Sequence, residues 1–364
     1  MYSFEPTEEQ KMLMDAVKRY AIDDLRAAYR DAEEEGELPA KLIEKGWELG
    51  YLQASIPEEY DGFGERSALT GVLAMEEMAY GDLAATIAVM VPGLFATPIL
   101  LAGNDAQKTK YIPPVIEMEW KPFTAAFMES KFDFDPNELS TTAVEQGENY
   151  IINGEKVYVP FAETCEALLV YASIDDQTQG FIVQRDTEGV IVGERQKLMG
   201  LNALPMYPVT FKSVKVPKED RLGGTEGHDF APILDASRLA IASMAIGLSK
   251  AAFEYSRDYA KDREVFGVKV AQKQAIAFML AEMATEIEAI RLLVWEAAWM
   301  VDNGNPEASK QSFLALTGAA DLAMMVTDRA VQILGGHGYI REHPVELWMR
   351  NGRGFSFFNG LAIV

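Results

Sequence analysis

The sequence predicts an α+β protein of three domains: an all-α N-terminal domain (residues 1–121), a middle β-barrel domain (122–225) and a C-terminal helical bundle (226–364). Three observations predict this order. Apolar residues recur at helical spacing near both ends, short β-branched and aromatic segments fill the middle, and 364 residues are enough for two or three domains. Strands clustered between helical blocks favour a separate β domain over alternating βαβ units. No G-x-G-x-x-G motif follows a strand, so a nicotinamide-binding Rossmann site is not expected.

The N-terminal domain is read as a series of helices. The first is expected to begin at Thr7, because Gln10 three residues later completes a capping box. The acidic run Asp31–Glu37 is expected to be a solvated loop or helix end. Residues 68–89 are apolar nearly all round, which predicts a central helix. A further helix is expected in 97–115, ending at the paired prolines.

The middle domain is predicted from strands such as "NYIINGEKVYV", "ALLVYASI" and "YPVTFKSVKVP". Asn153-Gly154 accepts the positive φ values of a type I′ turn, so a hairpin is expected there. Cys165 is the single cysteine, which excludes an internal disulfide, fits a reducing compartment and suggests a packing role.

The C-terminal domain is predicted to be a bundle of antiparallel helices that also forms the subunit interface. Its evidence is an apolar seam with alternating steps of four and three residues: Met283, Ile287, Ile290, Val294, Ala297 and Val301. The segment 223–230 ("GGTEGHDF") is read as the linker that precedes it.

The charge balance limits the classes of partner. The net charge of −23 disfavours nucleic acid and anionic membrane surfaces. No signal peptide precedes the acidic start, and no apolar run is expected to reach the ~18 residues of a transmembrane helix. We therefore expect a cytoplasmic protein with no nucleic-acid or membrane partner.

The tail, Asp328 to Gly360, carries the most specific motif. "AVQILGGHGYIREHPVELWMR" closely resembles the C-terminal signature of the acyl-CoA dehydrogenase family, and the resemblance extends over nearly the whole chain. In that family, Gln332, Gly335 and Gly336 would contact the adenosine diphosphate part of FAD in a neighbouring subunit. "DREVFGVKVAQKQ" adds Arg263, Phe266 and Gln274 to the same set, with Arg263 expected to pair with pyrophosphate. We refer to these six residues as the donated set.

The residues that each family member keeps for its own flavin depart from the pattern. A threonine is replaced by Met128, which is followed by Glu129, Ser130, Lys131 and Phe132. The Trp-Ile-Thr strand becomes Tyr158-Val159-Pro160, in which Tyr158 could still stack on flavin but Pro160 has no N–H to donate. Polar positions become apolar in 202–206 ("NALPM"), and the threonine of the terminal motif becomes Leu361.

The catalytic base of the family is also missing. Where the resemblance calls for the Glu of "YEGT", the chain reads Phe358-Asn359-Gly360-Leu361. The family's second location for the base, before the arginine of "LDASRLAIA", holds Ser237 before Arg238. Asp235 lies roughly 200° round the helix from Ser237 and should face elsewhere. Family resemblance assigns substrate contacts to Arg238 and Asn359, with the Asn359 N–H as an expected donor.

The three histidines, His228, His337 and His343, are scattered in sequence without metal-ligand spacing, so no metal site is expected.

Three functions remain open at this point. The chain could be a base-lacking subunit of a hetero-oligomeric acyl-CoA dehydrogenase, with FAD held mainly by a catalytic partner subunit. It could instead be a homo-oligomeric flavoenzyme with altered chemistry or an unidentified base, or a non-enzymatic acyl-CoA- or FAD-binding scaffold. The resemblance further implies acyl-CoA as ligand, a dimer-of-dimers tetramer and an electron-transfer flavoprotein as redox partner.

Overall fold

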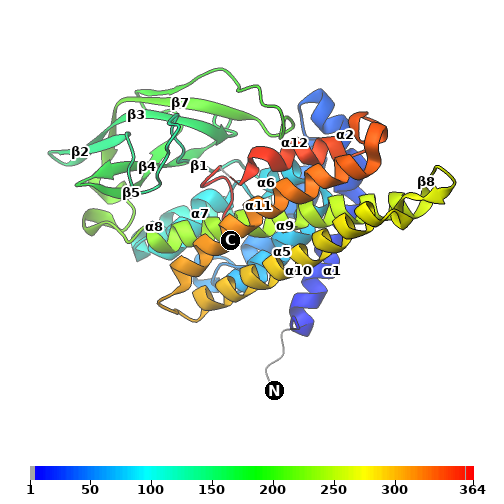
Figure 1. Ribbon diagram of the computed structural model, residues 1–364. Coiled ribbons are helices and arrows are strands. Elements are labelled where there is room, and N and C mark those ends of the chain that lie inside the picture. The colour runs from blue at the N-terminus through cyan, green and yellow to red at the C-terminus, as the bar shows by residue number, and fades with distance from the viewer. Residues whose placement is uncertain (1–4, 357) are drawn as a thin grey trace.

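The computed structural model describes residues 5–356 and 358–364 and confirms the three-part α+β architecture. Figure 1 shows the β-sheet domain on one side of the molecule and the helices of both chain ends packed together beside it. The predicted boundaries at 121/122 and 225/226 fall between the last N-terminal helix, the sheet and the first bundle helix. We propose them as domain boundaries.

The N-terminal domain consists of short helices around a buried central one. Thr7 caps the first helix in the expected capping box with Gln10. The helix predicted for 68–89 is broken at Asp82, whose carboxylate accepts a hydrogen bond from the Ala85 N–H (2.8 Å) and caps a second helix. The elements in order are α1 (Glu8–Tyr20), the π-helical η1 (Ala21–Leu25), α2 (Arg26–Glu35), α3 (Ala40–Trp47), α4 (Tyr51–Ala54), η2 (Glu58–Tyr60), α5 (Ala68–Gly81), α6 (Leu83–Met90), α7 (Gly93–Ala102), α8 (Asp105–Tyr111) and η3 (Pro113–Val115).

The middle domain is a seven-stranded mixed sheet with the order β1-β4-β2-β3-β7-β6, and β5 pairs with β4. One apolar core lies within it and includes Cys165, so the predicted packing role of the cysteine is confirmed. The strands are β1 (Thr124–Ala126), β2 (Thr142–Gln146), β3 (Asn149–Pro160), β4 (Ala167–Ile174), β5 (Gln177–Gln184), β6 (Val190–Val192) and β7 (Met206–Pro217).

The prediction of a hairpin turn at Asn153-Gly154 is wrong. Both residues lie inside β3, where the pairing with β7 shifts register between Ile152 and Gly154. The chain reverses earlier, at Gly147 (φ 61°), between β2 and β3. Gly154 is required for space, because a Cβ at this position would lie 2.5 Å from Thr141 Oγ1.

The C-terminal domain is a bundle of long helices, and the seam residues Met283, Ile287, Val294 and Ala297 are buried in it as predicted. Its elements, with the connectors that precede them, are η4 (Lys218–Asp220), η5 (Gly224–Glu226), α9 (Ala231–Asp262), β8 (Glu264–Val265), β9 (Val268–Lys269), η6 (Val270–Gln272), α10 (Gln274–Asp302), α11 (Ala308–Leu334), η7 (Gly335–Tyr339) and α12 (Val345–Phe355).

Contrary to the expectation from sequence, α9 is long and apolar enough to span a membrane. However, 83% of its most apolar window is buried inside the protein, as in a bundle core helix.

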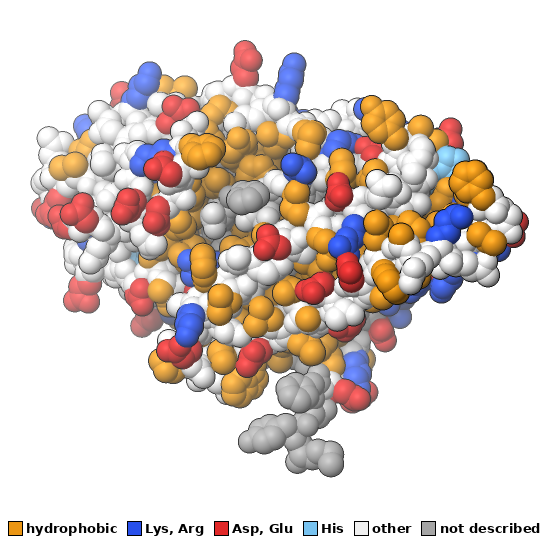
Figure 2. Space-filling model, viewed as in Figure 1, with side chains coloured by type: hydrophobic (Ala, Val, Ile, Leu, Met, Phe, Trp, Pro, Cys, Tyr) orange, Lys and Arg blue, Asp and Glu red, His pale blue; other side chains and the backbone are white. Residues whose placement is uncertain are grey.

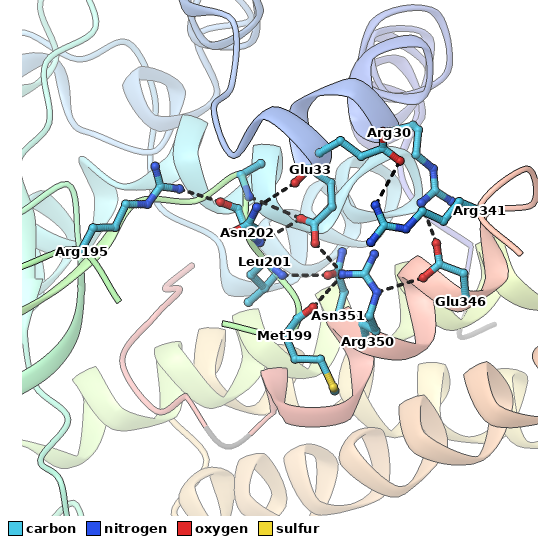
Figure 3. A network of polar contacts seen from close by, with 12 residues as sticks. Arg30, Glu33, Arg195, Met199, Leu201, Asn202, Arg341, Glu346, Arg350 and Asn351 are labelled. Atoms are coloured by element: carbon cyan, nitrogen blue, oxygen red, sulfur yellow. Dashed lines mark hydrogen bonds and ion pairs between the residues drawn. The ribbon is translucent and has the colours of Figure 1, made fainter. Parts of the chain in front are cut away.

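A buried polar network joins α2, the loop before β7 and α12 (Figure 3). Glu33 accepts hydrogen bonds from Arg350 Nη1 (2.7 Å) and the Asn202 N–H (2.8 Å), and Asn351 accepts one from the Leu201 N–H (2.8 Å). Glu33 is only 6% exposed. The acidic run Asp31–Glu37 is therefore not uniformly solvated as expected: Glu33 holds three distant segments together.

Candidate functional site

The two segments to which the resemblance assigns the catalytic base meet in this fold. Ser237 lies on α9 and Gly360 follows Asn359 in the tail, and the Gly360 N–H donates a hydrogen bond to Ser237 Oγ (3.1 Å). Gly360 has a φ of 74°, and a Cβ there would lie 2.5 Å from Phe127 Cδ1, so glycine allows the tail to pass close to the ring. The two positions that the motifs single out, far apart in sequence, thus lie together. Neither side chain is a carboxylate.

An apolar cavity of about 20 Å³ adjoins this pair. One wall consists of three mutually contacting rings, Phe127, Tyr171 and Phe230, with centroids 5.1–5.6 Å apart. The other lining residues are Leu94, Ala125, Ile233, Leu234, Ser237, Gly360, Ala362 and Ile363. A volume of this size holds about one water molecule.

A second cavity, of about 10 Å³, lies where the family would place the flavin ring. Met128, Tyr158, Pro160 and Phe358 are among the residues that line it. The rings of Tyr158 and Phe358 meet edge to face across it, with centroids 4.9 Å apart. The Tyr158 backbone adopts a φ of 57°, beside a register shift in β3, and its N–H is held by Gln196 Oε1 (2.8 Å).

This second cavity does not fit a flavin. Ligand pockets usually enclose about 300–1,000 Å³, whereas the described residues leave only about 10 Å³ here. The Pro160 nitrogen offers no donor, and the Tyr158 N–H is already committed to Gln196. The position at which the family resemblance would place the chain's own flavin is therefore closely lined by the chain's own side chains.

A buried ion pair supports the wall of this position. Lys156 Nζ donates to Glu129 Oε1 (2.9 Å) and to the Phe127 carbonyl (2.9 Å), and Glu129 also accepts from the Ser140 and Thr141 N–H groups. Burial acts to raise the pKa of Glu129, but Lys156 and the two amides lower it to about 2. Burial lowers the pKa of Lys156 to about 8, against the opposing effect of Glu129. Glu129 is thus a structural residue, and nothing in the sequence pattern pointed to the role of Lys156.

Arg238 and Asp235 lie on the α11 side of α9. Asp235 accepts hydrogen bonds from Arg238 Nη1 (3.2 Å) and from Ser309 Oγ, and the Arg238 guanidinium lies 5.3 Å from the Phe313 ring centroid. Asp235 is not among the residues that line the two cavities, and it faces away from the Ser237–Gly360 pair as expected. A substrate contact by Arg238 stays a prediction.

The donated set gathers at one end of the helical bundle. Arg263 follows the last residue of α9, Phe266 lies at the β8–β9 turn, and Gln274 begins α10. The turn that holds Gly335 and Gly336 reaches the same end, because the Tyr259 hydroxyl of α9 bonds to His337 Nδ1 (2.9 Å). All six residues are exposed, and a Cβ on either glycine would meet nothing within 4 Å.

The sequence positions suggested three scattered histidines, but two of them lie side by side in the fold. His337 and His343 stack with ring centroids 5.2 Å apart, and the Tyr255 hydroxyl bonds to His343 Nδ1 (2.7 Å). Partial burial and the neighbouring His337 lower the pKa of His343. Within residues 5–356 and 358–364, no group of three or more metal-ligating side chains is present.

Comparison with known proteins gives a consistent result over the whole chain. Residues 7–119, 124–214 and 230–362 match the N-terminal, middle and C-terminal domains of acyl-CoA dehydrogenase. Among curated relatives, the caffeyl-CoA reductase–Etf complex subunit CarC of Acetobacterium woodii is 36% identical, with 98% of this chain and 96% of the relative aligned. The 3-(aryl)acrylate reductase of Clostridium sporogenes is 32% identical over 98% of this chain and 96% of its own length.

Solved structures agree. Butyryl-CoA dehydrogenase from Megasphaera elsdenii superimposes with a TM-score of 0.89 at 30% identity, covering 99% of this chain and 96% of that one. A chain in a structure of the electron transferring flavoprotein of Acidaminococcus fermentans gives a TM-score of 0.89 at 33% identity, with the same coverage. The chain therefore belongs to the acyl-CoA dehydrogenase family, whose members are oxidoreductases that act on acyl-CoA.

Proposed function

We propose that this chain is a subunit of a hetero-oligomeric acyl-CoA dehydrogenase, that it completes the FAD site of a related catalytic subunit, and that it does not dehydrogenate acyl-CoA alone. The observation that carries the proposal is the absence of a carboxylate at Asn359 and Ser237, two positions that the hydrogen bond from the Gly360 N–H to Ser237 Oγ brings together. Removing the proton at Cα requires a positioned base, and such a base typically contributes 10²–10⁴-fold to the rate. The hydroxyl of Ser237 and the amide of Asn359 are not basic near neutral pH.

The exposed donated set supports the second half of the proposal. Proteins of this family are FAD flavoproteins. Arg263 would pair with the pyrophosphate of a partner's FAD, because its planar and permanently charged guanidinium can bind two oxygens at once. Gly335 and Gly336 leave the backbone open to close approach by an adenosine. Phe266, Gln274 and Gln332 would complete the contact.

Assembly through the C-terminal helices follows from the same proposal. Apolar side chains of α10 and α11 are exposed, namely Phe278, Leu292, Trp299, Phe313 and Leu314, and Figure 2 shows apolar side chains spread over the face on which these helices lie. We expect a two-fold interface as the unit, within a dimer of dimers. A cytoplasmic location, without nucleic-acid or membrane partners, stays our prediction.

Two relatives favour a second candidate function. They are named as a reductase–Etf complex subunit and an acrylate reductase. The chain could accordingly serve a flavoenzyme that exchanges electrons with an electron-transfer flavoprotein and reduces an enoyl-CoA. Such an enzyme with a full FAD complement would correspond to the altered-chemistry alternative.

Flavin stoichiometry decides between the donor-subunit proposal and this second candidate. It is measured on the purified chain alone and on the chain mixed with a catalytic subunit that carries an intact "YEGT" motif. The donor-subunit proposal expects FAD near zero in the chain alone and about one per heterodimer with the partner. Arg263→Ala should then release the partner's flavin, whereas Lys261→Ala, which removes the same charge two residues earlier, should not. Near-full FAD occupancy of the isolated chain would overturn the proposal in favour of the second candidate.

A further inference from the structure

The segment Leu361–Val364 is buried in the interior of the protein. Its four side chains are only 3–6% exposed, and all four belong to the main apolar core. The segment continues inward from Gly360, and its last residue is marked C in Figure 1. Four consecutive buried apolar residues without helix or strand pairing need a specific receiving surface.

Three residues of the N-terminal domain form this surface: Arg66 in the loop before α5, Gly71 of α5 and Gly93 of α7. Arg66 donates two hydrogen bonds to the Val364 carbonyl, from Nε (3.0 Å) and Nη2 (2.6 Å). Gly71 of α5 leaves the space that Val364 fills, because a Cβ on Gly71 would lie 2.7 Å from Val364 Cβ. Gly93 of α7 is in turn open toward Ile363, since a Cβ added to Gly93 would lie 3.7 Å from Ile363 Cγ2.

The same segment reaches the cavity beside the base positions. Ala362 and Ile363 line that cavity together with Ser237 and Gly360, and only about 20 Å³ remains open. A base acts on Cα of an acyl thioester, so the acyl chain of a ligand bound here would extend from Ser237 and Gly360 into the space against Leu94, Phe230 and Ile233. Ala362 and Ile363 already contact that space.

We propose that the buried segment Leu361–Val364, through Ala362 and Ile363 in the wall of the acyl cavity, excludes the acyl chain of an acyl-CoA from this subunit's own site. The proposal rests on the proposed assignment of Ser237 and Asn359 as the family's base positions. The proposal adds a second reason for inactivity besides the missing base, because a carboxylate restored at Ser237 or Asn359 would face a cavity that has no room for the acyl chain of a substrate. Arg66 is then a positioning residue that holds the segment in place.

Binding of a series of acyl-CoA thioesters to the full chain tests this inference. Calorimetric titration would compare free CoA with butyryl-, hexanoyl- and octanoyl-CoA. In an open apolar cavity each buried CH₂ tightens Kd roughly fourfold, so octanoyl-CoA would bind roughly 200-fold more tightly than butyryl-CoA. We expect less than a twofold difference for the wild-type chain. A steep dependence on chain length in the wild type would overturn the proposal.

The double variant Ile363→Ala/Val364→Ala is the complementary test. It should regain at least a tenfold preference for octanoyl- over butyryl-CoA, because the removed side chains leave apolar space. Ile333→Ala, at another buried isoleucine that is 4% exposed and lines neither cavity, is the matched control and should show no such gain. A folded double variant without chain-length dependence would contradict the inference.

The remaining outcomes are also decisive. If the double variant does not fold, as judged by circular dichroism, the wild-type series decides alone. If the wild type binds neither CoA nor its thioesters, appearance of octanoyl-CoA binding in the double variant supports the proposal and its absence overturns it. Full FAD occupancy of the isolated chain would refute the donor-subunit function and leave the thioester series readable.

Discussion

Replacing Lys156 with methionine tests whether the buried ion pair holds the wall of the flavin position. The Lys156 side chain is fully buried and that of Glu129 is 3% exposed. The change removes the ammonium from two acceptors, Glu129 Oε1 and the Phe127 carbonyl, while the Ser140 and Thr141 N–H groups stay on the carboxylate. Breaking a buried pair by removing one partner costs about 3–5 kcal/mol. Because the two amides still compensate part of the charge, we expect a loss near the lower limit, about 3 kcal/mol in the free energy of unfolding at pH 7.

Urea denaturation followed by circular dichroism measures this loss. Lys121→Met is the matched control, since Lys121 pairs with Glu117 at 2.6 Å on the surface, and loss of an exposed pair costs about 0–1 kcal/mol. The double variant Glu129→Gln/Lys156→Met should lose less than the sum of the single variants, because no buried charge is left unpaired. A cost for Lys156→Met no larger than that for Lys121→Met would refute the reasoning.

The same assay at acid pH provides an internal check on the carboxylate. The pKa of Glu129 is about 2 in the folded protein, below the ordinary value of 4.5. A depressed carboxyl pKa contributes stability that is fully present above the unfolded pKa and is lost as pH falls toward the folded one. The stability advantage of the wild type over Glu129→Gln should therefore begin to shrink as pH falls below about 4.5. An advantage that grows in this range would contradict the assignment.

The remaining predictions concern the sheet and the polar network. Gly154→Ala should lower the free energy of unfolding by roughly 1–3 kcal/mol, because the φ of Gly154 is 152° and the added Cβ would meet Thr141. Thermal melting measures this loss, and an unchanged melting temperature would contradict the prediction. Arg350→Met should cost about 3–5 kcal/mol, since it leaves Glu33 buried without its cation. Arg341→Met, at a side chain that is 72% exposed, should cost at most about 1 kcal/mol in the same urea titration, and equal costs would refute the importance of the network.

The sequence predicted the features that depend on local pattern. Helical spacing and the capping box at Thr7 identified the helices, whereas the base positions taken from family motifs stay predictions. Asn153-Gly154 misled because an Asn-Gly pair is a local turn signal, whereas pairing with β7 keeps these residues inside a strand. The hydrogen bond between Glu33 and Arg350 joins residues 317 positions apart in the sequence, and no local sequence pattern around either residue indicates it.

The filled cavities could not be predicted for a similar physical reason. The composition of Leu361–Val364 shows that the segment is apolar, but not which surface receives it. That surface depends on space left by Gly71 and on two hydrogen bonds from Arg66, nearly 300 residues earlier. The contact of Tyr158 with Phe358 likewise depends on the positive φ of Tyr158 at an irregular point of β3.

The β8–β9 turn and the Tyr158 segment of β3 both contain a strained backbone, but they differ in what offsets the strain. Phe266 and Gly267 both have positive φ (56° and 77°), as a two-residue type I′ turn requires, and Phe266 is 93% exposed. A non-glycine residue held in this region costs about 1–3 kcal/mol. Within the subunit, the exposed ring has the Lys273 ammonium 5.3 Å from its centroid, and such an exposed contact offsets only about 0.5–1 kcal/mol. Burial of the ring against another molecule would recover about 1.5–3 kcal/mol, a similar amount. In β3, Tyr158 has the same strained backbone, but its ring packs against Phe358 within the subunit. If Tyr158 lies at the chain's own flavin position and Phe266 contacts a neighbour's flavin, as we propose, the strain is offset within the subunit at Tyr158 and is largely left for a partner to offset at Phe266.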